Sequence, residues 1–158
     1  MSAIPLTVSG VERLQQELHR LKTVERPEVI NAIAEARAQG DLSENAEYDA
    51  ARERQAFVEG RIKELEGTLS NAQVIDPSTL DSEGRAVFGA TVEIEDLESG
   101  QRVRYQIVGD IEADIRENRI SISSPVARAI IGRSEGDVVE VQAPSGVREY
   151  EVLSISYV

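Results

Sequence analysis

Hydrophobic positions in the first part of the chain follow the spacing of a helical seam. Four apolar residues recur three or four positions apart: Val11, Leu14, Leu18 and Leu21. This is the spacing that buries the narrow stripe of a coiled coil. Thr7 or Ser9 can cap the helix, and Ser9 with Glu12 has capping-box spacing. Pro27 predicts a kink or local break, after which helical character resumes and ends at Gly40.

A second helix is predicted from Ser43 or Glu44 to about Val74. Its apolar residues have the same alternation of three and four: Val58, Ile62, Leu65, Leu69 and Ala72. Two such helices joined by a short turn form an antiparallel hairpin. With roughly 30 residues in each helix, the hairpin is on the order of 45 Å long. The turn, residues 40–43, then lies at its far tip.

The periodicity changes after residues 76–84 (DPSTLDSEG), whose Asp, Pro, Ser and Gly are typical of a linker. Alternating or β-branched apolar residues then predict strands, at 90–97, 102–108, 120–122, 138–141 and 150–157. Ser124, Pro125 and Gly132 predict the start and end of a short helix. The predicted fold class is α+β. An N-terminal antiparallel coiled-coil hairpin (1–76) precedes a linker (77–84) and a small antiparallel β domain with a short helix (85–158).

The composition excludes several kinds of site. The 158 residues include no cysteine, which rules out disulfides, thiol nucleophiles and cysteine-based zinc sites. The net charge is −12, so little nonspecific attraction to free nucleic acid is expected. The chain start lacks the pattern of a signal peptide, and no apolar run is long enough to span a membrane. These features favour a cytoplasmic protein with no membrane partner.

The predicted tip concentrates acidic residues. Four carboxylates fall within nine positions: Asp41, Glu44, Glu47 and Asp49. Carboxylate oxygens are the ligands that Mg²⁺ prefers, and Mg²⁺ often takes only one or two from a protein. Acidic residues near a helix N-terminus are also common without any metal, because they complement the helix dipole. The chain contains no closed ligand set, so tight metal binding by this protein alone is not expected.

Basic residues flank the same segment, at Arg37, Arg52 and Arg54. They are candidates for phosphate contacts, but ion pairs on a solvated helix face are the simpler alternative. The only histidine, His19, lies one step off the apolar seam, where a surface or packing role is favoured over catalysis.

Five segments together carry a resemblance to a known family: IPLT (4–7), RPEVINAIAEARAQGDLSENAEYDAARE (26–53), GRIKELEGTLSNAQVID (60–76), FGATVEIED (88–96) and ISISSPVARAIIGRSEGD (120–137). Over essentially its whole length the chain resembles the GreA/GreB family of bacterial transcript-cleavage factors. Its acidic balance is more similar to GreA than to the more basic GreB.

The resemblance implies a C-terminal domain of FKBP-like fold that docks at the rim of the secondary channel of bacterial RNA polymerase. It implies that the hairpin enters this channel and stimulates the polymerase to cleave the RNA 3′ end after backtracking. The protein would then be a monomeric factor and not an enzyme. It would bind no cofactor alone, would use Mg²⁺ in the polymerase active site, and would meet the nascent RNA 3′ end only within the complex.

Carried over by position, Asp41 and Glu44 match the tip carboxylates of the family. The resemblance implies that they help to retain the second Mg²⁺ of the polymerase and orient the attacking water. Arg37 and Arg52 match basic positions directed toward RNA, whereas the resemblance does not extend clearly to Arg54.

Other matched positions belong to the tip motif and to the docking segment. Asn45 and Tyr48 lie in the motif and are expected to shape the turn. Ser124, Pro125 and Arg128 match the segment that docks on polymerase.

Three alternatives stay open. An inhibitory member of the same family would keep the architecture but change the tip, whereas GDLSENAEY is intact here. A prolyl isomerase would need an aromatic-lined pocket, and residues 84–158 hold only Phe88 and three tyrosines. A purely structural hairpin would not require the acidic turn.

Overall fold

The computed structural model describes residues 3–40, 45–79 and 83–157. The chain divides into two compact units. The first is built from residues 11–72, and the second combines residues 4–10 with the chain from residue 73 onward. Asp41 and Glu44, two of the predicted site residues, lie outside the described residues.

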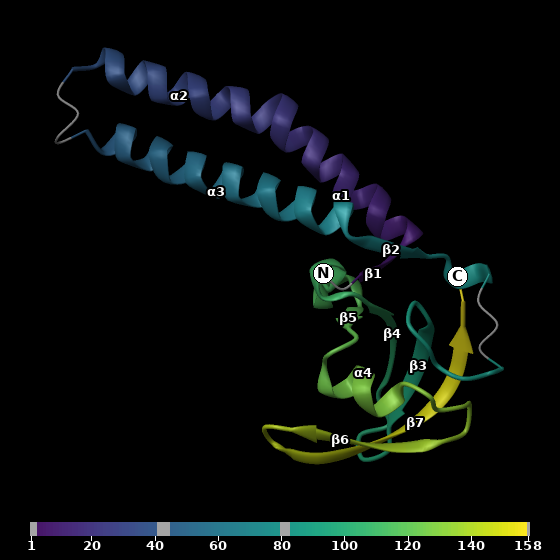
Figure 1. Ribbon diagram of the computed structural model, residues 1–158. Helices are drawn as coiled ribbons and strands as arrows, with labels where there is room; N and C mark the ends of the chain where they lie inside the picture. Colours follow the sequence, from purple (N-terminus) through teal and green to yellow (C-terminus); the bar gives the residue numbers. More distant parts are fainter. Residues whose placement is uncertain (1–2, 41–44, 80–82, 158) are drawn as a thin grey trace. The chain divides into compact units, whose positions relative to one another are not determined.

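The first unit is a helical hairpin (Figure 1). One long helical run is followed by a second helix beside it, with these bounds: α1 (Val8–Arg20), the π-helical segment η1 (Leu21–Glu25), α2 (Arg26–Ala38) and α3 (Ala46–Ser70). Five residues of the predicted seam are buried, Leu14, Leu21, Val58, Ile62 and Leu65, whereas Val11, Leu18, Leu69 and Ala72 are half-buried. Further buried side chains extend the seam: Val29, Ile33 and Ala36 on the first run, and Ala51 and Thr68 on α3. The predicted antiparallel hairpin is therefore confirmed.

The predicted interruption at Pro27 takes the form of the π-helical segment η1. Proline has no amide proton to donate to the preceding turn. The chain accommodates this with wider hydrogen bonding, in which the Arg26 amide donates to the Leu21 carbonyl, five residues back. The helix continues through this segment and is not broken.

The predicted extent of the second helix was wrong at its C-terminal end. The helix α3 ends at Ser70, and residues Ala72–Ile75 form a short strand, β2, instead of another helical turn. Asn71 explains the stop, because its side-chain amide donates to the Gly67 carbonyl across 2.8 Å and competes with the helical ladder. At the other end α3 begins at Ala46, and the predicted start at Ser43 or Glu44 falls outside the described residues.

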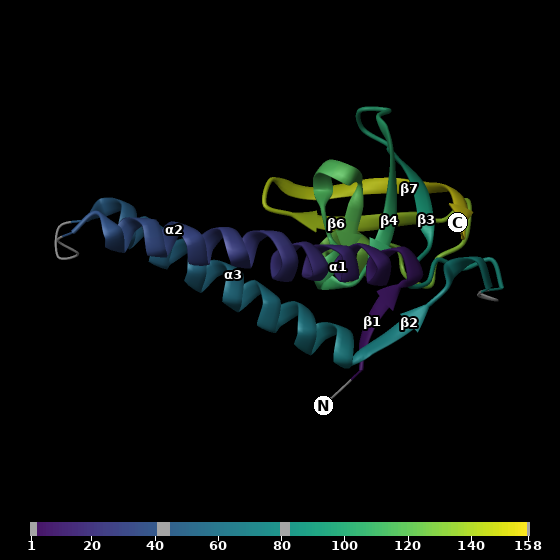
Figure 2. The same cartoon turned by 90° about the horizontal axis from the view of Figure 1, so that it is seen from above.

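The second unit is built on a five-stranded sheet with strand order β5-β4-β3-β7-β6. The strands are β3 (Thr91–Asp96), β4 (Arg102–Val108), β5 (Arg119–Ser121), β6 (Val138–Ala143) and β7 (Gly146–Ser156). Figure 2 shows β3, β4 and β7 as neighbours. All pairings are antiparallel except that of β5 with β4, which is parallel and was not predicted.

The core of this unit lies between the sheet and the helix α4 (Pro125–Ile130). Ala127 and Ile130 of α4 pack with Val92, Ile94 and Val152 of the sheet, all of them buried. The α+β class and the short helix are confirmed. The likeness to an FKBP fold stays a prediction.

Residues 4–10 differ from the predicted domain bounds, because they belong with the second unit. The strand β1 (Ile4–Thr7) pairs with β2, and Leu6 and Thr7 are fully buried. Within the segment predicted as a linker, Pro77 is also buried and begins a 3-10 turn, Pro77–Thr79. No helix within the described ranges is long and apolar enough to cross a membrane.

Candidate functional site

Asn45 joins the ends of the two hairpin helices on either side of the tip turn. Its side-chain oxygen accepts the Tyr48 amide across 3.0 Å, which caps the N-terminus of α3. Its side-chain nitrogen donates to the Ala36 carbonyl across 2.8 Å, in the last turn of α2. One amide therefore satisfies a free donor of one helix and a carbonyl of the other. The expectation that Asn45 shapes the turn stays a prediction, because residues 41–44 lie outside the described residues, but Asn45 does join the two helix ends that flank them.

A second contact crosses the same junction. The Arg37 guanidinium lies 5.9 Å from the centre of the Tyr48 ring, within the range of a cation–π interaction. Beneath it, Val29, Ile33 and Ala51 form a small buried cluster against which Tyr48 packs. Together with the Asn45 bonds, these contacts hold the described part of the tip in one arrangement.

Gly40 ends α2 in the way predicted. Its φ is +110°, which favours glycine, and its amide donates to the Arg37 carbonyl across 3.3 Å. The residues that follow, 41–44, include the two candidate carboxylates. The chain leaves α2 at Gly40 and re-enters the helical hairpin at Asn45, so the bonded Ala36–Asn45 pair encloses both of them in sequence.

The other two acidic residues of the tip motif, Glu47 and Asp49, are exposed in the first turn of α3. Carboxylates at this position are favoured by the helix dipole, which is the simpler of the two interpretations of the acidic cluster for this pair. Within residues 3–40, 45–79 and 83–157, no group of three or more acidic or histidine side chains could hold a metal ion.

The three basic candidates have different surroundings. Arg54 forms an ion pair with Glu28 across the hairpin, with 3.1 Å between Nη2 and Oε2, so ion pairing is the better interpretation there. Arg37 and Arg52 are exposed. Among the described residues no carboxylate forms an ion pair with either of them. His19 is exposed on α1, as expected.

The predicted docking segment lies around α4. Ser124 caps this helix, since its hydroxyl oxygen accepts the Ala127 amide across 3.2 Å, and Gly132 has a φ of +83°. Pro125 and Arg128 are exposed on the helix. The structure thus gives Ser124 a local structural role and leaves Pro125 and Arg128 open to a partner.

A serine–carboxylate network stands just before α4. Asp110 accepts hydrogen bonds from the hydroxyls of Ser121 and Ser123, the second across 2.9 Å. These two bonds lower the pKa of Asp110. Sequence reasoning missed this network, because Asp110 and the serines are eleven or more residues apart and no local motif connects them.

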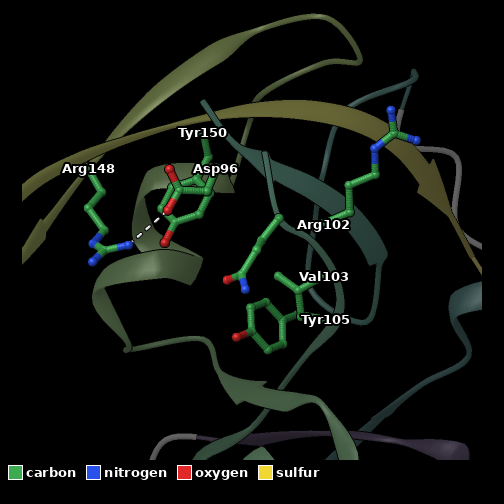
Figure 3. Close-up of a pocket in the computed structure, with 7 residues that line it drawn as sticks. Asp96, Arg102, Val103, Tyr105, Arg148 and Tyr150 are labelled. Carbon is green, nitrogen blue, oxygen red and sulfur yellow. Dashed lines mark hydrogen bonds and ion pairs between the residues drawn. The ribbon is translucent and has the colours of Figure 1, made fainter. Parts of the chain in front are cut away.

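A pocket of about 470 Å³ opens on the sheet of the second unit (Figure 3). Tyr105 and Tyr150 line it, and Arg148 reaches Asp96 with 2.8 Å between Nη1 and Oδ2. Asp96 also accepts hydrogen bonds from the backbone amides of Glu98 and Ser99. The Glu98 amide has the largest effect on the pKa of Asp96, and together with Ser99 and Arg148 it lowers that pKa. The lining is mostly polar and charged, unlike the aromatic pocket that a prolyl isomerase would need.

Comparison with known proteins follows the same two-part division. Residues 4–74 match the family described as "Transcription elongation factor, N-terminal", and residues 81–157 match "Transcription elongation factor, GreA/GreB, C-term". The chain belongs to the GreA/GreB family of transcription elongation factors. The resemblance found in the sequence is therefore confirmed, and interaction with RNA polymerase follows for a transcription elongation factor.

Related GreA/GreB proteins match over nearly their full length. The protein named "Transcription elongation factor GreA" from Verminephrobacter eiseniae is 68% identical, and the protein of the same name from Ralstonia nicotianae is 66% identical. Each match covers 99% of both chains. A crystal structure of GreA factor homolog 1 (Gfh1) of Thermus thermophilus is 33% identical, with a TM-score of 0.45 over 98% of this chain and 99% of that one.

Proposed function

We propose that this protein rescues backtracked bacterial RNA polymerase by entering the secondary channel and stimulating the polymerase to cleave the RNA 3′ end. The proposal rests chiefly on the closed hairpin end, where Asn45 bonds across the turn to Ala36. Membership of the elongation factor family and the intact GDLSENAEY segment support it. The polymerase supplies the catalytic centre, and this chain acts on it as a factor.

A long, narrow hairpin suits entry into a channel. With 25 residues, α3 is roughly 37 Å long at 1.5 Å per residue. Its seam is filled by aliphatic side chains, and its ion pairs run between the two helices, as in Arg26–Glu59 and Arg61–Glu17. A hairpin held in this way can deliver its turn to a distant site without needing a partner to order its helices.

Asp41 and Glu44 are proposed as the residues that act at the polymerase active centre. When Mg²⁺ is bound there, it supplies a Lewis acid and an activated water for phosphodiester cleavage. Two carboxylates of this chain would add the hard oxygen ligands that a weakly held ion lacks, and would orient the water through hydrogen bonds. Two carboxylates are too few to hold Mg²⁺ firmly, which agrees with a site shared with polymerase.

Arg37 and Arg52 are proposed to face the backtracked RNA. Both are exposed near the tip, and a guanidinium donates well to phosphate oxygens. Arg54 is assigned no such role, because Glu28 already engages it. Pro125 and Arg128, with Ser124 holding the start of α4, are proposed to dock at the channel rim. The protein is proposed to act as a cytoplasmic monomer.

The decisive experiment measures RNA cleavage in purified, backtracked elongation complexes with Mg²⁺. It compares the native chain with Asp41→Ala/Glu44→Ala and with a control, Asp49→Ala/Glu53→Ala. The control removes the same charge from exposed positions of α3. We expect the native chain and the control to release short 3′ fragments, and the tip variant to bind polymerase without stimulating cleavage.

Two results would contradict the proposal. If the native chain binds polymerase but suppresses cleavage, the protein is an inhibitory member of the family. If both double variants stimulate cleavage as well as the native chain does, the acidic turn is dispensable and the hairpin acts by another route.

A further inference from the structure

Glu112 is a buried carboxylate that holds the start of the first helix. Only 5% of its surface is exposed. Its Oε2 accepts a hydrogen bond from the Thr7 amide across 3.0 Å, and its Oε1 accepts one from the Thr7 hydroxyl across 2.6 Å. Thr7 is itself buried and lies 105 positions away in the sequence. Losing a hydrogen bond at a buried carboxylate is costly, because the group stays shielded from water that could replace the bond.

Thr7 also forms a hydrogen bond with the first turn of α1. Its hydroxyl oxygen accepts the Gly10 amide across 3.0 Å, so Thr7 caps the helix in the way the sequence suggested. One hydroxyl therefore donates to Glu112 and accepts from the first turn of α1. The carboxylate of Glu112 thus lies beside the N-terminal turn of α1.

Two glycines let the backbone approach this closely. A Cβ added to Gly10 would lie 1.8 Å from the Glu112 Oε1, and one added to Gly109 would lie 2.6 Å from the Pro5 carbonyl oxygen. Neither glycine has a positive φ, so space and not backbone conformation explains the residue type. The contact thus involves β1, the first turn of α1 and residues 109–112.

The strand β1 also connects the two helices of the hairpin through its pairing with β2. The strand β1 leads directly into α1, and β2 follows α3 after Asn71, and these two strands pair with each other. Thr7 therefore lies where the chain passes from β1 into α1, and its strand pairs with the strand that follows α3. We name this contact of Glu112, Thr7 and Gly10 the root clasp.

We propose that Glu112 is a positioning residue for transcript cleavage, because the root clasp restrains the first turn of α1, the helix through which the chain enters the hairpin. The inference rests on the proposed function, since it concerns how reliably the tip turn reaches the polymerase active centre. A rotation of a few degrees at Thr7 displaces a tip roughly 45 Å away along the hairpin by an ångström or more. Misplacement of a reacting group by about 1 Å can lower the rate up to 100-fold.

The activity test uses Thr7→Val, which removes the hydroxyl at similar shape, and Thr7→Ser, which keeps it. Glu112→Gln tests the charge, and Glu140→Gln serves as control because Glu140 is exposed on β6. For Thr7→Val and Glu112→Gln we expect the maximal cleavage rate to fall about tenfold. The concentration giving half-maximal stimulation should stay within about twofold, since the proposed docking residues are untouched. Thr7→Ser and Glu140→Gln should behave as the native chain.

A direct readout does not depend on activity. The chain has no cysteine, so cysteines introduced at the exposed residues Glu53 and Arg116 would carry the only two spin labels. Pulsed electron spin resonance then reports the distribution of distances between α3 and the second unit. We expect Thr7→Val to broaden this distribution and Thr7→Ser to leave it unchanged. Near-ultraviolet circular dichroism of the tyrosines checks that the second unit stays folded.

Several outcomes would overturn the inference. An unchanged distance distribution in Thr7→Val and Glu112→Gln would show that the clasp does not restrain α1. A parallel loss of polymerase binding, cleavage and folded signal would reduce Glu112 to a structural residue. If the native chain fails to stimulate cleavage, the proposed function fails instead, and the spin-label comparison still decides whether the root clasp restrains the hairpin.

Discussion

The side chain of Asn45 donates to the Ala36 carbonyl across 2.8 Å while its oxygen caps the helix α3. A single amide thereby closes the hairpin around a turn of residues 41–44. Asparagine offers a donor and an acceptor in one short planar group, and it is also a favoured N-cap. The residue type at this position therefore follows from two simultaneous bonds.

Substitutions at Asn45 should separate these two bonds. Asn45→Asp keeps the cap oxygen but replaces the donor with an acceptor facing the Ala36 carbonyl. Asn45→Ala loses both bonds, and the lost cap alone costs about 1 kcal/mol. We expect hydrogen exchange at the Tyr48 amide to accelerate in Asn45→Ala and much less in Asn45→Asp. Stimulated cleavage should fall in both.

Asn71→Ala is the matched control for this comparison, because it removes an asparagine from the opposite end of α3. Equal losses of cleavage in Asn71→Ala and Asn45→Ala would mean that general helix stability, and not closure of the tip, is what matters.

The Arg61–Glu17 pair should contribute more to hairpin stability than the Arg54–Glu28 pair. Two guanidinium nitrogens reach the Glu17 carboxylate, at 2.6 and 3.0 Å, and the side chain of Arg61 is only 27% exposed. Lysine cannot reproduce a two-point contact. Arg61→Lys should lower the free energy of unfolding by about 1 kcal/mol, and Arg54→Lys, which loses a single exposed contact, by a few tenths of that. Thermal unfolding measures both, and equal effects would contradict the argument.

Local patterns predicted most of the fold, and contacts between distant residues escaped them. The apolar seam gave the hairpin, and Ser124 with Gly132 gave the limits of α4, because these signals lie within a few residues. The strand β2 was missed for two reasons. Ala72 continues the helical spacing of apolar residues, and the partner of β2 is β1, which is distant in the sequence. The tip carboxylates came from a resemblance and not from spacing, since acidic residues at a helix start are ordinary.

The stability of the second unit should depend on pH through Asp96. Its folded-state pKa lies below the ordinary value of about 3.9, chiefly because the Glu98 amide donates to it, with further help from Ser99 and Arg148. A lowered pKa means that the charged form stabilises the fold. This contribution is fully present above the ordinary value and is lost as the pH falls through the folded-state pKa.

Denaturant unfolding between pH 7 and pH 3 tests this dependence. Asp96→Asn should unfold at lower denaturant than the native chain at pH 7, and the two midpoints should approach each other as the pH falls below the ordinary pKa of an aspartate. The control Glu98→Gln changes an exposed side chain but keeps the amide that Asp96 accepts. A difference between Asp96→Asn and the native chain that is constant over the whole range would show that the charge of Asp96 is not the cause.

Substitutions at two residues of the proposed docking segment should have different effects, one on stability and the other on polymerase binding. Ser124→Ala removes the cap of α4, so it should lower the free energy of unfolding by about 1 kcal/mol, whereas Ser124→Asp keeps a capping oxygen and should not. Arg128 is exposed and supports no described contact within the unit, so Arg128→Gln should leave unfolding unchanged and weaken polymerase binding. Calorimetry of the free protein and titration against core polymerase distinguish these effects. If Arg128→Gln binds as tightly as the native chain while Ser124→Asp binds weakly, the serine hydroxyl makes the docking contact and the arginine does not.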